Sequence, residues 1–376
     1  MPKLVLFCHS LRSDWNHGNA HFLRGILAEW ARRGFSAVAW EPSDAWSARN
    51  LGAEYGEAAL NAWREAYPDL PVTVYDRAAL DLDQALDSAD LVIVHEWSAP
   101  DLVTHIAAHR RASGRYLLFF HDTHHRMATD PEAISRFDLD GFDGVLAFGE
   151  VLSEAYRRRF GGRQVFTWHE AADLSIFRPV PEIPRTRDLV WIGNWGDDER
   201  TDELSEFLIK PVQDLGLSAR VHGVRYPQEG RAALAAAGID YAGYLSNFRV
   251  PDAFAAARMT VHIPRRPYAT ALPGIPTIRV FEALACGIPL VSAPWHDIEH
   301  LFSPGDDFLV ARDGDVMRHH LGVLRADPDL AASLASRGRA TIEAQHSCAH
   351  RVDELLAICR SLGRDFDAPT TLAAAQ

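Results

Sequence analysis

The stretch Gly274-Ile-Pro-Thr-Ile-Arg-Val-Phe-Glu-Ala-Leu-Ala-Cys-Gly-Ile-Pro-Leu-Val-Ser-Ala293 decides the fold of this chain. Its pattern predicts a loop, a short helix, a tight turn and a buried strand. Two prolines and Gly274 keep the loop irregular, and Thr277 is a plausible N-cap for a helix whose apolar residues follow helical spacing. Gly287 fits the position just after the helix, and 288–291 has the composition of a buried parallel strand.

The start of this helix has the features of an anion site. A helix N-terminus offers free N–H groups and the positive end of the helix dipole. Arg279 lies in the first turn, where the dipole disfavours a cation unless an anion is also present, and Glu282 is a lone carboxylate in an otherwise apolar helix. We therefore expect an anionic ligand here. The alternative is that both side chains simply face solvent.

The segment Arg279-Val-Phe-Glu-Ala-Leu-Ala-Cys-Gly-Ile-Pro-Leu-Val-Ser292 resembles the donor-binding segment of GT-B glycosyltransferases, particularly the CgeB-like (spore-maturation-like) group. The resemblance implies that Glu282 holds the ribose of a nucleotide sugar, and that the backbone of Gly274 to Thr277 holds its diphosphate. We expect Arg279 and the amide of Ile278, in the first turn of the helix, to contribute to the same diphosphate site. The common retaining pattern has a second glutamate eight residues before the first. This chain has Gly274 there, which leaves that sugar contact open.

Length and composition indicate a globular protein of two domains. The chain has 376 residues, of which 47% are hydrophobic and 24% charged. Its formal net charge of −13 argues against a nucleic-acid scaffold and against a broad surface for anionic membranes. Only two lysines occur, so an anion site must be built from arginines and backbone amides.

The four cysteines show neither paired metal spacing nor the density of a disulfide scaffold. No signal peptide or membrane-spanning stretch is visible. We therefore expect a cytoplasmic protein with no stable membrane insertion, no cofactor and no bound metal. The oligomeric state stays open.

The N-terminal half alternates short apolar runs with amphipathic stretches, which predicts a doubly wound parallel sheet. The predicted strands are 4–8, 36–40, 72–75, 91–95, 116–120, 144–148 and 164–168, and the clearest helices are 20–33, 99–111 and 151–160. Ligands of such sheets bind at the carboxyl ends of the strands.

The first loop after a strand is 9–19, which lacks the G-x-G-x-x-G pattern of a dinucleotide site. By resemblance it takes the place of the glycine-containing turn of GT-B enzymes, which implies acceptor-side roles for Trp15, Asn16 and Gly18. The aromatic-rich insertion 41–69 that follows the second strand is expected to contribute mostly core side chains.

The densest polar cluster is His121-Asp-Thr-His-His-Arg126, directly after a very apolar strand. The resemblance implies that His121 contacts the donor sugar or manages the acceptor proton, with Asp122 as orienter or alternative base and His124 on the acceptor side. Two other interpretations stay open. The cluster is either a metal site, which adjacent residues of one loop rarely form, or a set of loop caps.

A proline-rich connector at 172–184 resembles the interdomain crossover of GT-B enzymes, and the strand 188–192 then opens the second domain. The loop after it contains Gly193, which permits close backbone approach to a ligand, and Asn194, where retaining relatives often have arginine. Arg200 either supplies the missing cation or pairs on the surface with Glu199 or Glu203.

Further strands are predicted at 218–223, 259–263 and near 308–310, and helices at 251–257 and from 228, 314, 328 and 347. By resemblance, the loop at 243–245 holds the nucleotide base, which points to Tyr244 and Leu245. Arg265 or Arg266 is a diphosphate candidate or a solvated charge pair. The D-x-D doublets at 81–83 and 138–140 are interpreted as caps or solvated acids.

Taken together, the sequence predicts an α/β protein of the GT-B type, with two Rossmann-like doubly wound domains facing across a cleft. The expected acceptor domain is 1–178, the donor domain 179–346, a helix crossing back 347–363 and a tail 364–376. The predicted function is metal-independent, hexosyltransferase-type transfer from a UDP- or GDP-linked sugar to an unknown small-molecule or glycan acceptor. The alternatives are a nucleotide-sugar epimerase of the same fold and a catalytically idle nucleotide-binding protein.

Overall fold

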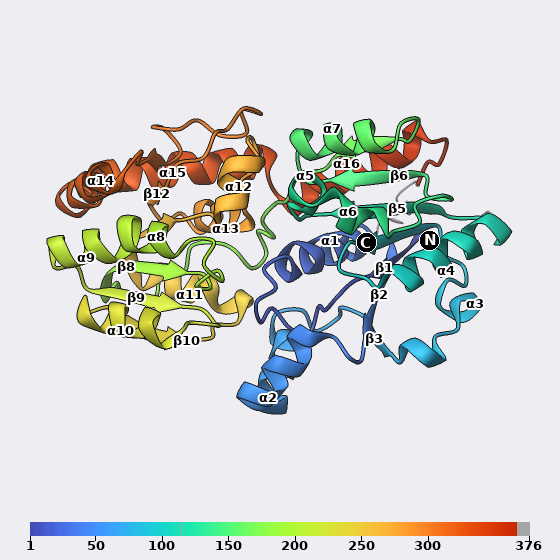
Figure 1. The fold of residues 1–376 in the computed structure, drawn as a ribbon, viewed down its shortest axis with the longest axis horizontal. Helices are drawn as coiled ribbons and strands as arrows, with labels where there is room; N and C mark the ends of the chain where they lie inside the picture. Colours follow the sequence, from blue (N-terminus) through green and yellow to red (C-terminus); the bar gives the residue numbers. More distant parts are fainter. Residues whose placement is uncertain (114, 367–376) are drawn as a thin grey trace, which may run out of the picture. The chain divides into compact units, whose positions relative to one another are not determined.

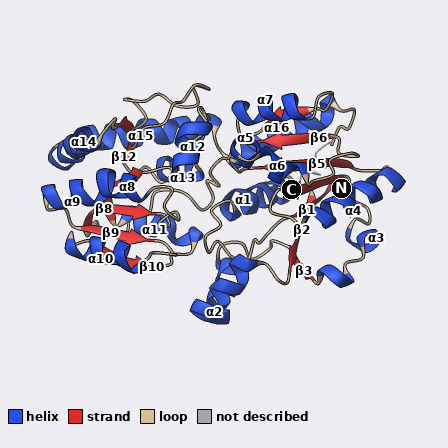
Figure 2. Cartoon of the chain, in the orientation of Figure 1, coloured by secondary structure: helices blue, strands red, loops and turns tan. Residues whose placement is uncertain are grey.

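The computed structural model describes residues 1–113 and 115–366, which form two parallel sheets with helices packed on them (Figures 1 and 2). The chain divides into two compact units. Unit 1 comprises Met1–Ser13, Asn19–His169 and the residues from Cys348 onward, and unit 2 comprises Asp14–Gly18 and Glu170–Ser347. None of the helices formed by the described residues combines the length and apolar character that crossing a bilayer needs.

The sheet of unit 1 has seven parallel strands in the order β3-β2-β1-β4-β5-β6-β7. Chain order reverses beside β1, because β2 and β4 pair with its two edges. In doubly wound sheets this reversal opens a crevice at the carboxyl ends of the strands. The strands are β1 Lys3–Phe7, β2 Ser36–Pro42, β3 Val72–Tyr75, β4 Leu91–His95, β5 Leu117–Asp122, β6 Gly144–Ala147 and β7 Val165–Thr167.

The helices of unit 1 include one contribution from the far end of the chain. The helix α16 packs on α1, where the Arg33 guanidinium donates to the Ala349 carbonyl at 2.8 Å and forms an ion pair with Asp353. The helices are α1 Ala20–Arg32, α2 Trp46–Asn61, α3 Leu82–Ala85, α4 Pro100–Ser113, α5 Arg126–Thr129, α6 Pro131–Ser135, α7 Glu150–Arg159 and α16 Cys348–Ser361.

The sheet of unit 2 has six parallel strands in the order β10-β9-β8-β11-β12-β13. Its strands are β8 Arg187–Ile192, β9 Ala219–His222, β10 Asp240–Gly243, β11 Ala257–His262, β12 Leu290–Ser292 and β13 Leu309–Val310. Its helices are α8 Thr201–Leu204, α9 Lys210–Leu215, α10 Gln228–Ala236, α11 Val250–Ala255, α12 Arg266–Ala271, α13 Ile278–Ala285, α14 Gly314–Ala326 and α15 Pro328–Gln345, with a π-helical turn, Ser205–Ile209, between α8 and α9.

Each strand predicted from the sequence overlaps an observed one, and the decisive stretch folds as the expected loop, helix, turn and strand. One strand, β10, was not predicted, because its exposed Asp240 and Ala242 lie on the sheet edge and give no apolar signal. The aromatic-rich insertion forms α2 and a 3-10 turn, with Trp63 buried but Tyr55 exposed. Of the predicted tail, 367–376 lie outside the described residues.

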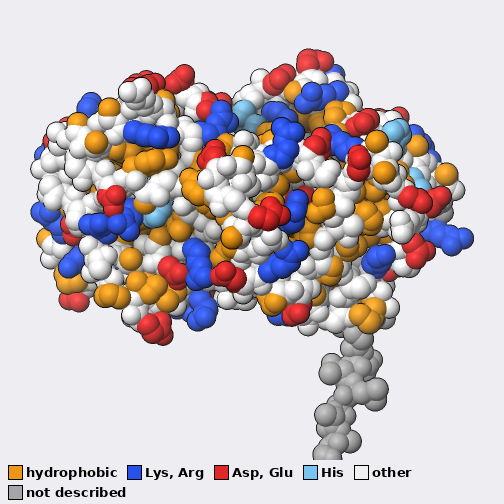
Figure 3. All heavy atoms as spheres, turned by 90° about the horizontal axis from the view of Figure 1, so that it is seen from below, with side chains coloured by type: hydrophobic (Ala, Val, Ile, Leu, Met, Phe, Trp, Pro, Cys, Tyr) orange, Lys and Arg blue, Asp and Glu red, His pale blue; other side chains and the backbone are white. Residues whose placement is uncertain are grey.

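The surface mixes charges of both signs. On the face drawn in Figure 3, lysine and arginine side chains alternate with acidic ones. Many of the arginines form ion pairs with nearby carboxylates, such as Arg220 with Asp240 at 2.7 Å and Arg339 with Glu343 at 2.7 Å.

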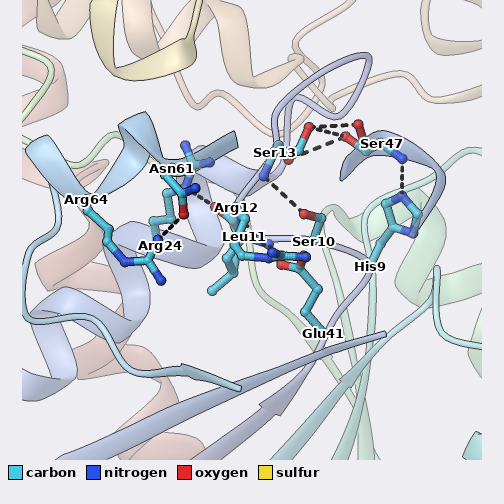
Figure 4. Close-up of polar contacts among 10 residues, drawn as sticks. All are labelled: His9, Ser10, Leu11, Arg12, Ser13, Arg24, Glu41, Ser47, Asn61 and Arg64. Atoms are coloured by element: carbon cyan, nitrogen blue, oxygen red, sulfur yellow. Dashed lines mark hydrogen bonds and ion pairs between the residues drawn. The ribbon is translucent and has the colours of Figure 1, made fainter. Parts of the chain in front are cut away.

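The loop after β1 is held by one buried carboxylate at the end of β2 (Figure 4). Glu41 is fully buried, and its Oε2 accepts hydrogen bonds from the backbone N–H groups of Leu11 and Arg12 at 2.8 and 3.1 Å. Its Oε1 accepts from Arg12 Nε at 2.7 Å. On the other side of the loop, the Leu11 carbonyl accepts from the buried Arg24 at 2.6 Å. The loop therefore leaves the sheet in a fixed direction.

We expect Glu41→Ala to lower the free energy of unfolding by about 3–5 kcal/mol, because it leaves the Arg12 charge and two buried N–H groups without their acceptor. Urea denaturation measures this loss. Glu57→Ala removes an exposed glutamate of α2 and should change the same free energy by no more than about 0.5 kcal/mol. A loss below about 1 kcal/mol for Glu41→Ala would show that the loop does not depend on this carboxylate.

Candidate functional site

Unit 2 contains a small pocket at the carboxyl ends of its central strands. Its volume is about 80 Å³, and the loops after β8, β9 and β10 and the first turn of α13 surround it. The lining residues are Asp14, Asn16, His17, Gly18, Ile192, Gly193, Asn194, His222, Gly223, Val224, Tyr244, Leu245, Asn247, Val250 and Arg279.

The helix α13 brings a buried carboxylate beneath this pocket. Glu282 is 0% exposed, and its Oε1 accepts from Asn247 Nδ2 at 2.9 Å, while its Oε2 pairs with Arg279 one turn earlier. An ionised carboxylate without water requires such partners. The alternative that Glu282 faces solvent is therefore wrong. Arg279 and Asn247 line the pocket, whereas Glu282 lies behind them. A ligand in the pocket would therefore contact these two side chains, which in turn contact the carboxylate.

The N-terminus of α13 begins where predicted, but its cap differs from the expected one. Thr277 occupies the N-cap position with extended backbone, yet its side chain makes no capping bond. Its Oγ1 pairs instead with Nε2 of the buried His262 at 3.0 Å. The N–H of Ile278 donates a hydrogen bond to Glu170, so a buried acid already occupies one of the helix amides expected for a phosphate.

The ionisation of these buried groups follows from their surroundings. Burial, and then the nearby Glu282 charge, raise the pKa of Glu170 to about 8. Burial, followed by the charges of Arg200 and Arg279, lowers the pKa of His262 to about 3. At neutral pH the corner beneath the pocket therefore holds a neutral imidazole and a largely protonated carboxyl group.

A side chain at position 274 would be strained in this fold. Gly274 has φ +91°, and an added Cβ would lie 2.8 Å from Cγ and 2.9 Å from Oε1 of Glu299, which would have to shift. The left-handed backbone thus favours glycine over the glutamate that the retaining pattern places here. The Glu299 carboxyl, from the loop after β12, fills the volume where that side chain would begin.

The loop after β8 holds a largely buried arginine. Arg200 donates from Nη1 to the Ile263 carbonyl at 2.9 Å and from Nη2 to the Asn194 carbonyl at 2.6 Å, and it stacks on the Trp191 ring. The described contacts thus give it carbonyl partners, in place of the predicted surface alternative with Glu199 or Glu203. Burial, and then the charge of Arg265, lower its pKa to about 10, so it remains a cation at neutral pH.

The two glycines of this rim serve packing. A Cβ on Gly193 would lie 2.7 Å from the Trp191 ring, and one on Gly223 would lie 2.1 Å from the Gly193 carbonyl. The loops after β8 and β9 therefore touch backbone to backbone. Arg265 pairs with Glu199 at 3.3 Å, and Arg266 pairs with Glu203 at 2.9 Å, so both have acidic partners.

The residues expected for the base and for the acceptor meet at this pocket. Tyr244 and Leu245, after β10, line it together with Asn16 and Gly18. Asn16 Oδ1 accepts a hydrogen bond from Asn194 Nδ2, whose own Oδ1 accepts from the Val224 N–H at 2.9 Å. Trp15 is buried beside them in the chain but does not line the pocket. The structure thus groups Asn16 and Gly18 with the donor residues of unit 2.

Sequence reasoning missed several lining residues, among them Asp14 and Asn247, and it missed three buried or crowded groups that contact the start of α13 or the loop before it, namely Glu170, His262 and Glu299. No local pattern distinguishes them, because each reaches the site from a separate loop or strand end. Asn247 is the most informative, since its side chain bonds Glu282 and its backbone N–H bonds Asp14 Oδ2 at 3.0 Å. Only the fold places it between these two carboxylates.

In unit 1, His121 lies in the core. It is 0% exposed, and its ring packs against Phe22, His95 and Trp168 with centroid distances of 5.8, 5.2 and 5.0 Å. Neither ring nitrogen has a hydrogen-bond partner among the described residues. Burial lowers its pKa to about 3, so the imidazole is neutral at physiological pH.

Asp122 is equally buried, and it organises the loop after β5. Its Oδ1 accepts from the His124 N–H at 2.8 Å, and its Oδ2 accepts from the Tyr156 hydroxyl at 2.7 Å. Burial raises its pKa to about 6. The His124 ring is less buried and packs edge-on against Trp97 at 5.3 Å. His124 and His125 are therefore the rings of this loop that are less buried than His121.

The structure describes no metal cluster: within 1–113 and 115–366, no group of three or more His, Cys, Asp or Glu side chains is arranged to hold an ion. The two D-x-D doublets serve local turns, as predicted. Asp81 caps α3 by accepting from the Gln84 N–H at 3.2 Å, and Asp138 accepts from the Asp140 N–H at 2.9 Å.

Residues 200–357 match a protein-family model described as glycosyl transferase-like. This segment is less than half of the chain, but it contains α13, Glu282 and the loop after β10. No curated protein sequence matches the chain.

Several solved structures are similar to the chain over nearly its whole length. Sucrose-phosphate synthase from Thermosynechococcus elongatus is 15% identical with a TM-score of 0.65, covering 96% of this chain and 99% of that one. HepE of Anabaena, in complex with UDP-glucose, is 15% identical with a TM-score of 0.67, covering 96% and 100%. T4 phage BGT, in complex with UDP and Mn2+, is 12% identical with a TM-score of 0.60, covering 97% and 100%. These similarities establish that the chain has the α/β GT-B fold of glycosyltransferases.

The burial of His121 predicts a loss of stability in acid. Its folded pKa of about 3 lies below its ordinary value of 6.5, so its contribution to stability is complete above pH 6.5 and is lost as the pH falls toward 3. The difference in the free energy of unfolding between the native protein and His121→Phe should therefore change against the native protein as the pH falls through this range. We expect a change of about 1.4 kcal/mol per pH unit.

Urea denaturation at several pH values measures this difference, with His105→Phe at an exposed position of α4 as the matched control. A difference that stays constant between pH 7 and pH 4 would contradict a neutral, buried imidazole.

Proposed function

We propose that this protein is a glycosyltransferase that moves a sugar from a nucleotide-sugar donor, bound in unit 2, to an acceptor that binds unit 1. The observation that carries the proposal is the buried Glu282 of α13, whose two partners, Arg279 and Asn247, line a pocket at the carboxyl ends of a doubly wound sheet. Pockets at this edge are where open α/β sheets bind ligands. The fold and the family match of 200–357 support the same assignment.

In this proposal each part of the donor meets a different strand end. Glu282 accepts hydrogen bonds from the ribose hydroxyls, which replace one of its present partners, Arg279 or Asn247. The loop at 243–245 holds the base through its backbone. The diphosphate lies at the start of α13, near Arg279, Arg200 and Arg265. Cations fixed before the reaction stabilise the charge that develops on a departing diphosphate, and this is how the site would accelerate transfer.

We propose a uridine nucleotide as the donor, because HepE and BGT were solved with UDP-glucose and UDP. The resemblance of 279–292 to the CgeB-like group supports a place for the chain within that group. Where the retaining pattern has a glutamate at 274, we propose that Glu299 supplies the carboxyl facing the sugar, since it fills that space. The four cysteines are buried thiols that form no disulfide with one another, which supports a reducing compartment such as the cytoplasm.

The catalytic roles of His121 and Asp122 remain predictions. Both side chains are fully buried. His121 could contact a substrate only after its ring separated from the rings of Phe22 and Trp168. His124 of the same loop is the better exposed candidate for managing the acceptor proton. Comparing kcat of the folded His121→Phe and His124→Ala variants assigns the role to one ring or the other.

We expect Glu282→Gln to weaken UDP-sugar binding by about 1.5–3 kcal/mol, because an amide is a weaker acceptor for ribose hydroxyls than a carboxylate. Isothermal titration of the folded variant with a panel of UDP- and GDP-sugars measures this change. Glu343→Gln, an exposed ion-pair member of α15, is the matched control and should bind like the native protein. Equal affinity of Glu282→Gln and native protein would remove Glu282 from the donor site.

We expect turnover to survive chelation, because the cationic groups assigned to the diphosphate are arginines. Release of UDP from the best-bound donor is followed with and without EDTA, and in the presence and absence of candidate acceptors. Activity that disappears with EDTA and returns with Mg2+ or Mn2+ would contradict the metal-independent mechanism. Conversion of the donor to a second UDP-sugar without any acceptor and without net release of UDP would indicate the epimerase alternative, and binding without turnover would indicate an idle nucleotide-binding protein.

A further inference from the structure

Five residues, Asp14–Gly18, form a strap that belongs to unit 2, and all of them except Trp15 line its pocket. The Asp14 carboxylate accepts hydrogen bonds from the Tyr244 hydroxyl and, at 3.0 Å, from the Asn247 N–H. The Asn16 side-chain oxygen accepts from Asn194 Nδ2. The strap therefore offers acceptors to three hydrogen-bond donors, which come from the loops after two different strands.

The residues that donate hydrogen bonds to the strap are also residues that, in the proposed function, lie at the nucleotide site. Tyr244 lies in the loop expected for the base, and Asn194 lies in the loop after β8. Asn247 connects the strap to the ribose residue, because its N–H bonds Asp14 while its side chain bonds Glu282. An acceptor-rich, anionic ligand needs the same donors, so it and the strap cannot both occupy them.

The size of the pocket leads to the same conclusion. With the strap in place the pocket has about 80 Å³, whereas pockets for small-molecule ligands usually have about 300–1,000 Å³. The far end of the strap lies close to the start of α13, since a Cβ added to Gly18 would be in van der Waals contact with Cγ2 of Ile278, at 3.4 Å. A nucleoside diphosphate therefore has no room until the strap moves.

We propose that the strap is a built-in occupant of the donor site, which a nucleoside diphosphate must displace in order to bind. The proposal rests on the proposed function and adds regulation of the same site. The Asp14 carboxylate is the decisive group, because it satisfies the polar donors of the empty site and repels an incoming diphosphate. The apparent affinity for a nucleotide is then the intrinsic affinity multiplied by the fraction of molecules whose strap is released.

This arrangement predicts a gain of affinity from a loss of contacts. Asp14→Ala removes both hydrogen bonds of the carboxylate and its negative charge, so a larger fraction of molecules has an open site. We expect Asp14→Ala to bind UDP at least about tenfold more tightly than the native protein, which corresponds to the loss of one hydrogen bond to a charged group. Isothermal titration with UDP measures both dissociation constants.

The matched control is Asp329→Ala, which removes the same charge from an exposed position of α15 and should bind UDP like the native protein. A second measurement follows the strap itself. Hydrogen exchange of a peptide covering 14–18 should become faster when UDP is added to the native protein, because the nucleotide releases the strap. A segment that closed over the nucleotide would exchange more slowly.

The outcomes separate the two proposals. Tighter binding by Asp14→Ala together with faster exchange of the native strap supports displacement. Equal or weaker binding by Asp14→Ala, or slower exchange, overturns the strap proposal while UDP binding itself upholds the donor site. If neither protein binds UDP or a UDP-sugar, the proposed function fails, and the strap proposal fails with it.

Discussion

The ion pair between Glu282 and Arg279 is the interaction on which the site of unit 2 depends. The carboxylate is fully buried, and its charge is stabilised by Arg279 at one oxygen and by Asn247 at the other. Removing one partner of such a pair leaves an uncompensated charge, which costs more than the pair itself contributes. This requirement ties the first turn of α13 to the loop after β10. Asn247 and Glu282, which form the hydrogen bond between these elements, are 35 residues apart in the chain.

The parallel topology then supplies the remaining groups. All six strands of unit 2 point their carboxyl ends to one edge, where the loops after β8, β9 and β10 meet. The closeness of these loops has a steric basis, because Gly223 and Gly193 approach at a distance that no Cβ would allow. A side chain at Gly223 would collide with the Gly193 backbone, and one at Gly193 would collide with the Trp191 ring. The glycines of this rim therefore shape the site without contacting a ligand.

The electrostatics of the site reflect a chain with almost no lysine. Arg200 contacts two carbonyl oxygens and an indole ring. These partners are uncharged, so they fix the position of the guanidinium without neutralising its positive charge. Lysine has no planar fork with which to make the same contacts. Of the acids of unit 2, Glu199 favours the charged form of Arg200, whereas Glu170 is largely protonated at neutral pH. The Asp14 carboxylate is the acid that enters the pocket itself.

The sequence by itself determined the two parallel sheets, the bounds of most strands to within two residues, and the helix α13 with Glu282 and Arg279. Apolar periodicity and the positions of glycine and proline determine local structure within a few residues. The helices and strands that they specify can therefore be predicted without knowledge of the tertiary structure. The tertiary structure alone decided that His121 is a core side chain, that Gly274 is crowded by Glu299, and that Asp14 and Asn247 meet beside Glu282. These facts depend on which loops share one sheet edge. Burial and contact across hundreds of residues are set by packing, which leaves no periodic trace in the sequence.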